Sequence, residues 1–133
     1  MAKKILIVEA TAVQPSLNLE ASNYLVIEAK TADEGLSRAL ELKPQLVVMD
    51  MDLPDLSGFE LCKKMRSYYE LKKVPIIIFS SENKLKNMVT AYEMGADYYI
   101  VKSEEGDRVL TLLIETIFTR LARQNSPVQQ YTA

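Results

Sequence analysis

Short apolar segments recur along the chain, separated by longer stretches in which apolar residues have helical spacing. The five segments are Lys3–Val8, Tyr24–Ala29, Leu46–Met49, Pro75–Phe79 and Asp97–Val101. Apolar runs of this length, bounded by turn-forming residues, are typical of strands buried on both faces of a parallel sheet. We therefore predict a strand at each of the five segments.

Helices are predicted between these strands. Apolar residues three and four positions apart indicate helices within Ala10–Asn23, over 32–43, over Gly58–Glu70, over Lys84–Met94 and over Glu104–Arg123. The helix over Lys84–Met94 is amphipathic through Leu85, Met88, Val89 and Tyr92. The helical segments before and after it show the same periodicity, so strands and helices alternate along the chain.

Capping residues mark where several of these helices begin. Thr31 with Glu34, and Ser57 with Glu60, have the spacing of a capping box, in which a hydroxyl accepts a hydrogen bond from a free backbone N–H. Ser103 is expected to cap the last helix in the same way.

Alternating strands and helices require right-handed crossovers and a parallel sheet covered on both faces. We predict a doubly wound α/β domain with five parallel strands and the flavodoxin-like strand order 2-1-3-4-5. Residues 1–123 form this domain. Residues 124–133 are polar and are expected to form a flexible tail or the start of a linker.

The composition narrows the classes of function. The chain has 133 residues, a net charge of −2 and no histidine, so neither a basic nucleic-acid surface nor histidine-based catalysis is expected. The apolar runs are far shorter than the ~20 residues that a membrane span requires. Its single cysteine, Cys62, excludes an internal disulfide and is expected to face the core. A cytoplasmic location is the default for such a chain.

Four polar residues directly follow predicted strands: Glu9, Asp50, Ser80 and Lys102. In a parallel sheet all carboxyl ends lie at one edge, where open α/β sheets bind their ligands. Two carboxylates suit Mg²⁺, and an aspartate can act as a nucleophile toward phosphorus. A lysine and a hydroxyl can hold the oxygens of a phosphoryl group. The sequence therefore predicts a site for magnesium and phosphoryl chemistry at this edge.

The same segments carry a family resemblance. The matching stretches are Ile-Leu-Ile-Val-Glu at 5–9, Asp50 with Leu53, Pro54 and Gly58, Pro75–Ser81, and Gly95–Lys102. With these stretches the chain resembles the receiver domain of two-component response regulators over about residues 3–122. This resemblance implies signal transduction rather than ordinary enzyme activity, although receivers can catalyse their own phosphorylation and dephosphorylation.

The resemblance implies a role for each residue of the predicted site. Asp50 would accept a phosphoryl group from a histidine kinase or a phosphotransfer protein, and Lys102 would contact that group. Ser80 and Tyr99 would form the activation switch. The helix over Lys84–Met94, the strand that follows it and the last helix would form the face for a downstream protein partner and for a homodimer.

The resemblance also implies a Mg²⁺ site formed by Glu9, Asp50 and Asp52, of which Asp52 contributes its backbone carbonyl. The family normally has a second acid at the position of Ala10, so metal affinity is expected to be reduced. Ser103 replaces the proline that normally follows the lysine. A cis peptide bond before serine costs about 3 kcal/mol, so a trans bond is predicted here.

Three other functions compete with this interpretation. A degenerate receiver would act as a phosphorylation-independent interaction module, and the loss of an acid at Ala10 favours it. A haloacid-dehalogenase-type phosphatase would use Asp50 and Asp52 as paired acids, but that motif belongs on the first strand. A dinucleotide-binding domain requires a Gly-x-Gly-x-x-Gly motif after the first strand, which the chain lacks.

Overall fold

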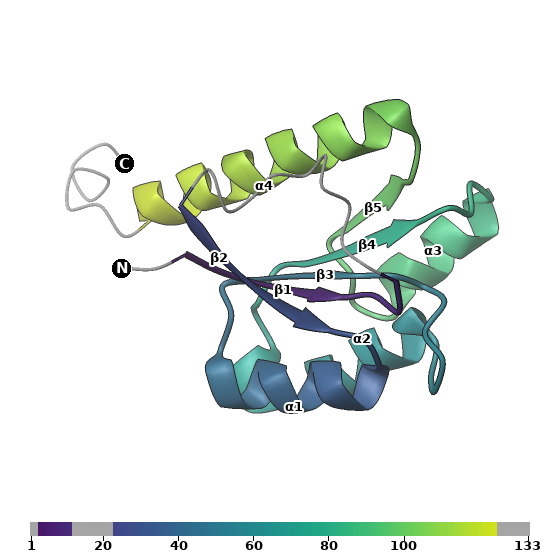
Figure 1. Cartoon of the computed structure of the whole chain (residues 1–133), viewed down its shortest axis with the longest axis horizontal. Coiled ribbons are helices and arrows are strands. Elements are labelled where there is room, and N and C mark those ends of the chain that lie inside the picture. Colours follow the sequence, from purple (N-terminus) through teal and green to yellow (C-terminus); the bar gives the residue numbers. More distant parts are fainter. Residues whose placement is uncertain (1–2, 12–22, 125–133) are drawn as a thin grey trace.

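Five parallel strands form a single sheet in the order β2-β1-β3-β4-β5, as predicted (Figure 1). The computed structural model describes residues 3–11 and 23–124. The strands are β1 (Lys3–Val8), β2 (Tyr24–Ala29), β3 (Leu46–Met49), β4 (Ile76–Ser80) and β5 (Tyr98–Val101). The predicted doubly wound, flavodoxin-like α/β class is therefore confirmed.

Four α-helices are present in the described part of the chain. They are α1 (Ala32–Leu42), α2 (Gly58–Arg66), α3 (Leu85–Glu93) and α4 (Glu104–Gln124). The helices α1, α2 and α3 contribute to the core on one face of the sheet, and α4 covers the other face (Figure 1). The helix expected within residues 10–23 falls mainly outside the described residues, and so does the tail from residue 125.

Alternating side chains of each central strand enter two separate cores. In β1, Leu6 and Val8 pack with α1, α2 and α3, whereas Ile5 and Ile7 pack with α4. All four residues of β3 are buried, as the uninterrupted apolar run predicted. Cys62 is fully buried in the first core, in agreement with its predicted place.

The prediction that α2 extends to Glu70 is wrong. The helix ends at Arg66, and the Ser67 hydroxyl donates a 2.6 Å hydrogen bond back to the Lys64 carbonyl. Tyr68 then has an extended backbone, and a 3₁₀ turn follows at Tyr69–Leu71. This turn carries Leu71 into the first core, where it is almost completely buried. Burial of Leu71 thus accounts for a break that helical spacing does not reveal.

The predicted caps of the helices are present. The hydroxyl of Thr31 accepts a hydrogen bond from the Glu34 N–H at 3.1 Å, and that of Ser57 accepts one from the Glu60 N–H at 3.1 Å. Ser103 accepts from the Gly106 N–H at 3.0 Å, so it caps α4 as expected. In the described ranges no helix is both long and apolar enough to cross a membrane.

Candidate functional site

The carboxyl edge of the sheet brings the four predicted polar residues together. Val8 pairs with Met49 in the β1–β3 register, so Glu9 and Asp50 emerge side by side from neighbouring strands. The backbone N–H of Asp50 donates to the Val8 carbonyl at 2.9 Å. On the next pair of strands, the Lys102 N–H donates to the Ser80 carbonyl at 2.7 Å. These backbone bonds fix the strand ends from which the side chains project.

Lys102 joins the two carboxylates. Its ammonium group lies 2.7 Å from Glu9 Oε1 and 3.0 Å from Asp50 Oδ2. The Glu9 side chain is 9% exposed and that of Asp50 17% exposed, so both anions are largely removed from water. The hydroxyl of Thr11 lies 3.4 Å from the same oxygen of Glu9. One cation therefore neutralises part of a negative pocket at the sheet edge.

The pKa of Lys102 reflects opposing effects. Burial by itself lowers this pKa, but the hydrogen bonds to Glu9 and Asp50, together with the charges of the two carboxylates, raise it above its ordinary value. The ammonium group is therefore charged at physiological pH. It can attract a phosphoryl group to Asp50 and can also compete with a metal ion for the two carboxylates.

A tight loop holds Asp50 at the end of β3. The Asp52 N–H donates to Asp50 Oδ1 at 3.3 Å, and the Gly58 N–H donates to the Met51 carbonyl at 2.8 Å. A Cβ atom at Gly58 would collide with the Asp50 carbonyl, so only glycine allows the start of α2 to approach this closely. Glycine at position 58 therefore belongs to the architecture of the site.

Ser80 and Tyr99 are connected through the backbone of Glu82. The buried Ser80 hydroxyl accepts a hydrogen bond from the Glu82 N–H at 3.1 Å, and the Tyr99 hydroxyl donates to the Glu82 carbonyl at 2.7 Å. The Tyr99 ring is partly buried against the first core, whereas Tyr98 packs against the second core on the opposite face. The two residues of the predicted switch thus share one connecting segment.

The donor atoms at this edge fit a magnesium ion that is completed by water and phosphate. Glu9 and Asp50 supply two carboxylates, and Mg²⁺ in proteins commonly takes one or two carboxylates with waters and phosphate oxygens. The side chains of Ala10 and Asp52 are exposed. Among the described residues, no three Asp, Glu, Cys or His side chains lie close enough to form a metal cluster.

Ser103 continues from Lys102 without distorting the strand end. No cis peptide bond occurs in the described residues, which agrees with the predicted trans bond before Ser103. A Cβ atom at Gly106 would collide with the Val101 carbonyl, so α4 begins in close contact with the end of β5. The cap by Ser103 and this close approach together fix the start of α4 next to Lys102.

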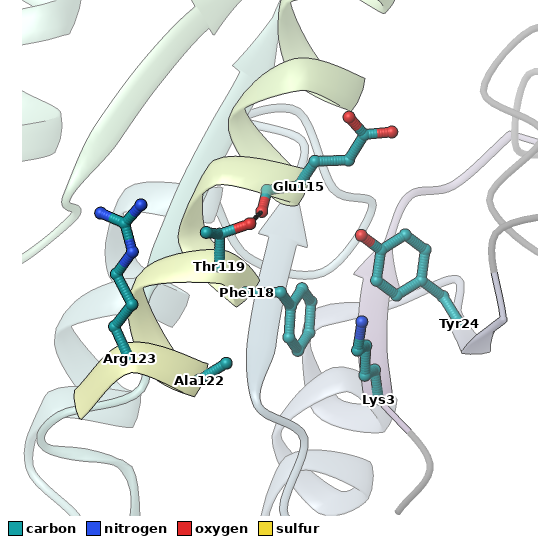
Figure 2. Close-up of a pocket in the computed structure, with 7 residues that line it drawn as sticks. All are labelled: Lys3, Tyr24, Glu115, Phe118, Thr119, Ala122 and Arg123. Carbon is teal, nitrogen blue, oxygen red and sulfur yellow. Dashed lines mark hydrogen bonds between the residues drawn. The ribbon is translucent and has the colours of Figure 1, made fainter. Parts of the chain in front are cut away.

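An open pocket of about 630 Å³ lies away from this edge (Figure 2). Lys3 and Tyr24 begin β1 and β2, so this pocket is at the opposite end of the strands. The Tyr24 and Phe118 ring centroids are 5.1 Å apart, and the Lys3 ammonium is 5.6 Å and 5.8 Å from them. Burial and then the charge of Glu115 raise the pKa of Tyr24. These contacts attach α4 to the sheet at the end opposite to the candidate site.

Two contact residues are absent from the sequence-based site. Asp55 accepts hydrogen bonds from the first backbone N–H groups of α1. Arg66 donates to the carbonyls of Gly95 and Val74 and pairs with Asp97 at 2.9 Å. In the sequence both are ordinary polar residues at a loop or a helix end. All but one of their bonds join them to partners more than 20 positions away, which no local pattern reveals.

This arrangement of strands and polar residues defines the class of protein. A family model for the response regulator receiver domain matches residues 5–114. The chain belongs to this family, as its motifs predicted. Receiver domains interact with histidine kinases or phosphotransfer proteins, generally bind Mg²⁺ and are not enzymes of the usual kind.

Individual relatives agree with this assignment. The chain is 38% identical over 105 residues to the alkaline phosphatase synthesis transcriptional regulatory protein PhoP of Bacillus subtilis, covering 77% of this chain and 43% of that protein. It is 34% identical over 110 residues to the transcriptional regulatory protein AfsQ1 of Streptomyces coelicolor, covering 83% of this chain and 47% of that protein. The chain thus spans about half the length of the curated relatives that it matches.

A solved structure matches nearly the whole chain. The CheY-like response regulator receiver domain protein of Methanospirillum hungatei superposes with a TM-score of 0.78 and 31% identity. The match covers 92% of this chain and 98% of that protein. This similarity extends over the receiver unit as a whole.

Proposed function

We propose that this receiver domain accepts a phosphoryl group on Asp50 from a histidine kinase or a phosphotransfer protein. The observation that carries the proposal is the position of Lys102, whose ammonium contacts both Glu9 and Asp50 at the carboxyl edge of the sheet. A carboxylate on a rigid strand end, with a cation beside it, can attack phosphorus with its charge partly neutralised.

The transfer step needs few groups from the protein. An oxygen of Asp50 forms a new bond to phosphorus, and the bond from phosphorus to the donor atom breaks. The electron pair of the broken bond stays on that donor, the histidine nitrogen of a kinase or the acetate oxygen of acetyl phosphate. Lys102 and the hydroxyl of Ser80 would hold oxygens of the transferred group.

A magnesium ion would be held by Glu9, Asp50 and the backbone carbonyl of Asp52. When bound, Mg²⁺ neutralises charge on the phosphoryl oxygens. The exposed Ala10 contributes no ligand, so we propose that this site binds the ion more weakly than a site with two adjacent acids. A loss of about 1–3 kcal/mol, by analogy with hydrogen bonds to charged groups, corresponds to roughly ten- to hundredfold in affinity.

The output surface is proposed to be the face formed by α3, β5 and α4, where a downstream protein or a second copy would bind. Leu85, Val89 and Tyr92 lie on α3 at positions i, i+4 and i+7, and these residues are 74%, 48% and 52% exposed. Such an apolar stripe on a surface helix is typical of a protein-binding surface. Tyr99, on β5, connects this region with Ser80 through Glu82.

Acetyl phosphate tests the proposal directly. Incubation with acetyl phosphate and Mg²⁺ is expected to add the mass of one phosphoryl group to the intact protein. Asp50→Asn should abolish the adduct, whereas Asp52→Asn, which changes a neighbouring exposed acid, should retain it. An adduct that persists in the Asp50 variant would refute the assignment. A wild-type protein without any adduct would instead favour a phosphorylation-independent receiver.

A further inference from the structure

Asp55 connects the loop after Asp50 to a different structural element. Its two carboxylate oxygens accept hydrogen bonds from the Ala32 N–H at 2.8 Å and the Asp33 N–H at 3.0 Å. These are first-turn N–H groups of α1, which have no acceptor within their own helix. Both partners lie more than 20 positions earlier in the chain, so the contact is tertiary and not part of the local turn.

This loop is also attached at its base and through apolar side chains that reach the first core. The Gly58 N–H closes the base by donating to the Met51 carbonyl at 2.8 Å. Leu53 and Leu56 are partly buried against the first core. A groove of about 150 Å³, lined by residues that include Leu36 and Asp55, lies between the loop and α1. The carboxylate therefore joins two elements that are not fully packed against each other here.

The start of α1 is also tied to the strand that carries Glu9. The Glu9 N–H donates to the Ala29 carbonyl at 2.8 Å, and Ala29 ends β2 just three residues before Ala32. Asp55 then links Ala32 to the loop that follows Asp50. One backbone hydrogen bond, the short segment from Ala29 to Ala32 and the side-chain contact of Asp55 thus join the two sides of the candidate magnesium and phosphoryl site through the first turn of α1.

We propose that Asp55 is a positioning residue, which holds the loop over residues 51–57, and with it the Asp52 carbonyl, at a fixed distance from Glu9. This inference rests on the proposed phosphorylation of Asp50 and deepens it. Asp55 contacts neither the phosphoryl group nor the metal. It acts by keeping the loop against α1, so that the groups contributed by β1 and β3 have a defined spacing.

The charge of Asp55 supports this role. The backbone N–H groups of Ala32 and Asp33 lower the pKa of Asp55, so the carboxylate is ionised at physiological pH. Hydrogen bonds to an ionised acceptor are shorter and stronger than neutral ones. The positive end of the α1 dipole also favours a carboxylate at this place.

Thr31 offers a matched control for the same helix end. Its hydroxyl accepts a hydrogen bond from the Glu34 N–H at 3.1 Å and therefore caps α1 through a bond within the helix's own first turn. Thr31→Ala removes a cap alone. Asp55→Ala removes a cap and also releases the loop, so the difference between the two variants isolates the positioning effect.

The test measures phosphorylation by acetyl phosphate and the urea midpoint of unfolding in the full chain. We expect both variants to lower the midpoint, Asp55→Ala more than Thr31→Ala because it loses two hydrogen bonds to a charged acceptor. Asp55→Ala should slow phosphorylation about tenfold, the scale of losing a residue that orients a metal ligand, whereas Thr31→Ala should leave the rate within about twofold. Asp55→Asn retains one acceptor oxygen, so its phosphorylation rate should lie between that of Asp55→Ala and that of the wild type. Equal rates in the two alanine variants would overturn the proposal.

Amide hydrogen exchange in the unphosphorylated protein provides a second measurement. Asp55→Ala should speed exchange at the Asp52 and Gly58 amides more than Thr31→Ala does, because these amides bond within the loop. Unchanged exchange would also overturn the proposal. If the wild-type protein gains no phosphoryl group, the proposed function fails, and the exchange rates still decide whether Asp55 holds the loop.

Discussion

The Tyr99 hydroxyl donates a 2.7 Å hydrogen bond to the backbone carbonyl of Glu82. The N–H of the same Glu82 donates to the buried Ser80 hydroxyl at 3.1 Å. A shift of Ser80 toward a phosphoryl group would therefore reach Tyr99 through one shared residue. Coupling of this kind requires an element with two arrangements that both sites bias, and the segment around Glu82 is the candidate.

Removal of the Tyr99 hydroxyl tests this coupling. Tyr99→Phe keeps the ring and should lower the free energy of unfolding by about 1 kcal/mol, because one neutral hydrogen bond is lost. If the bond is part of the switch, beryllofluoride with Mg²⁺ should raise the thermal midpoint of the variant by a different amount from the wild type. Tyr98→Phe, on the opposite face, is the control. Equal shifts in all three proteins would make Tyr99 a packing residue.

The Lys102 pairs predict a specific dependence on pH. Because the folded state raises the pKa of Lys102, its ion pairs stabilise the fold fully below the ordinary lysine pKa. That contribution is lost as the pH rises through the higher folded pKa. Stability measured from about pH 9 to 12 should therefore fall more steeply in the wild type than in Lys102→Met. The exposed Lys86 offers a control, and Lys86→Met should keep the steep fall.

Lys102→Met should also be less stable near neutral pH. The substitution leaves Glu9 and Asp50 without the cation that contacts both of them, at a cost of about 2 kcal/mol. Mg²⁺ should stabilise this variant more than the wild type, because the metal no longer competes with the ammonium group. Chemical unfolding with and without Mg²⁺ measures both effects, and an equal response to Mg²⁺ in the two proteins would contradict this competition.

Arg66 is expected to be a major determinant of stability. Its guanidinium donates to the carbonyls of Leu71, Val74 and Gly95 and pairs with Asp97. Lysine has the charge but not the planar fork of donors, so Arg66→Lys should lower the free energy of unfolding by about 2–4 kcal/mol. Lys63→Ala, an exposed position on the same helix, should change it by less than about 0.5 kcal/mol. Urea unfolding distinguishes the two, and a small effect at Arg66 would contradict this expectation.

The sheet and its functional edge could be predicted because their signals are local. Uninterrupted apolar runs fix the strands, and parallel order then places the residue after each strand at one edge. Glu9, Asp50 and Lys102 meet there, as the strand order predicted, and the structure adds that they form ion pairs. The position of Ser80 differs slightly from the prediction, because Ser80 is the last residue of β4 rather than the first residue after it. Its backbone pairs with β5 at Val101, which an apolar run that stops at Phe79 does not reveal.

The remaining features depend on contacts between distant segments. Helical spacing continues past Arg66, but burial of Leu71 ends α2 early. Leu85, Val89 and Tyr92 have the spacing of a core face, yet they are exposed, and Ala91 is the residue of α3 that is buried. An apolar periodicity shows that one side of a helix differs from the other. It does not show which side faces the sheet.

Ala10 provides the most direct test of metal binding. Its side chain is exposed next to Glu9, so a larger residue can be accommodated without disturbing the core. Ala10→Asp would add a third carboxylate to a pocket in which Lys102 already serves two. Each additional pair of like charges at ~4 Å repels by up to ~4 kcal/mol at an effective dielectric constant near 20. The variant should therefore be less stable than the wild type without metal.

Bound Mg²⁺ should offset this loss of stability. Since Mg²⁺ favours carboxylate oxygens, Ala10→Asp should bind it about tenfold or more tightly, and Mg²⁺ should restore the lost stability. Ala10→Asn has nearly the same shape as Ala10→Asp but no charge. It should therefore bind Mg²⁺ less tightly than Ala10→Asp and lose less stability without metal. Isothermal titration with Mg²⁺ and urea unfolding of the three proteins measure both quantities. Unchanged affinity in the aspartate variant would mean that Glu9 and Asp50 already satisfy the ion, or that the Lys102 ammonium keeps it out.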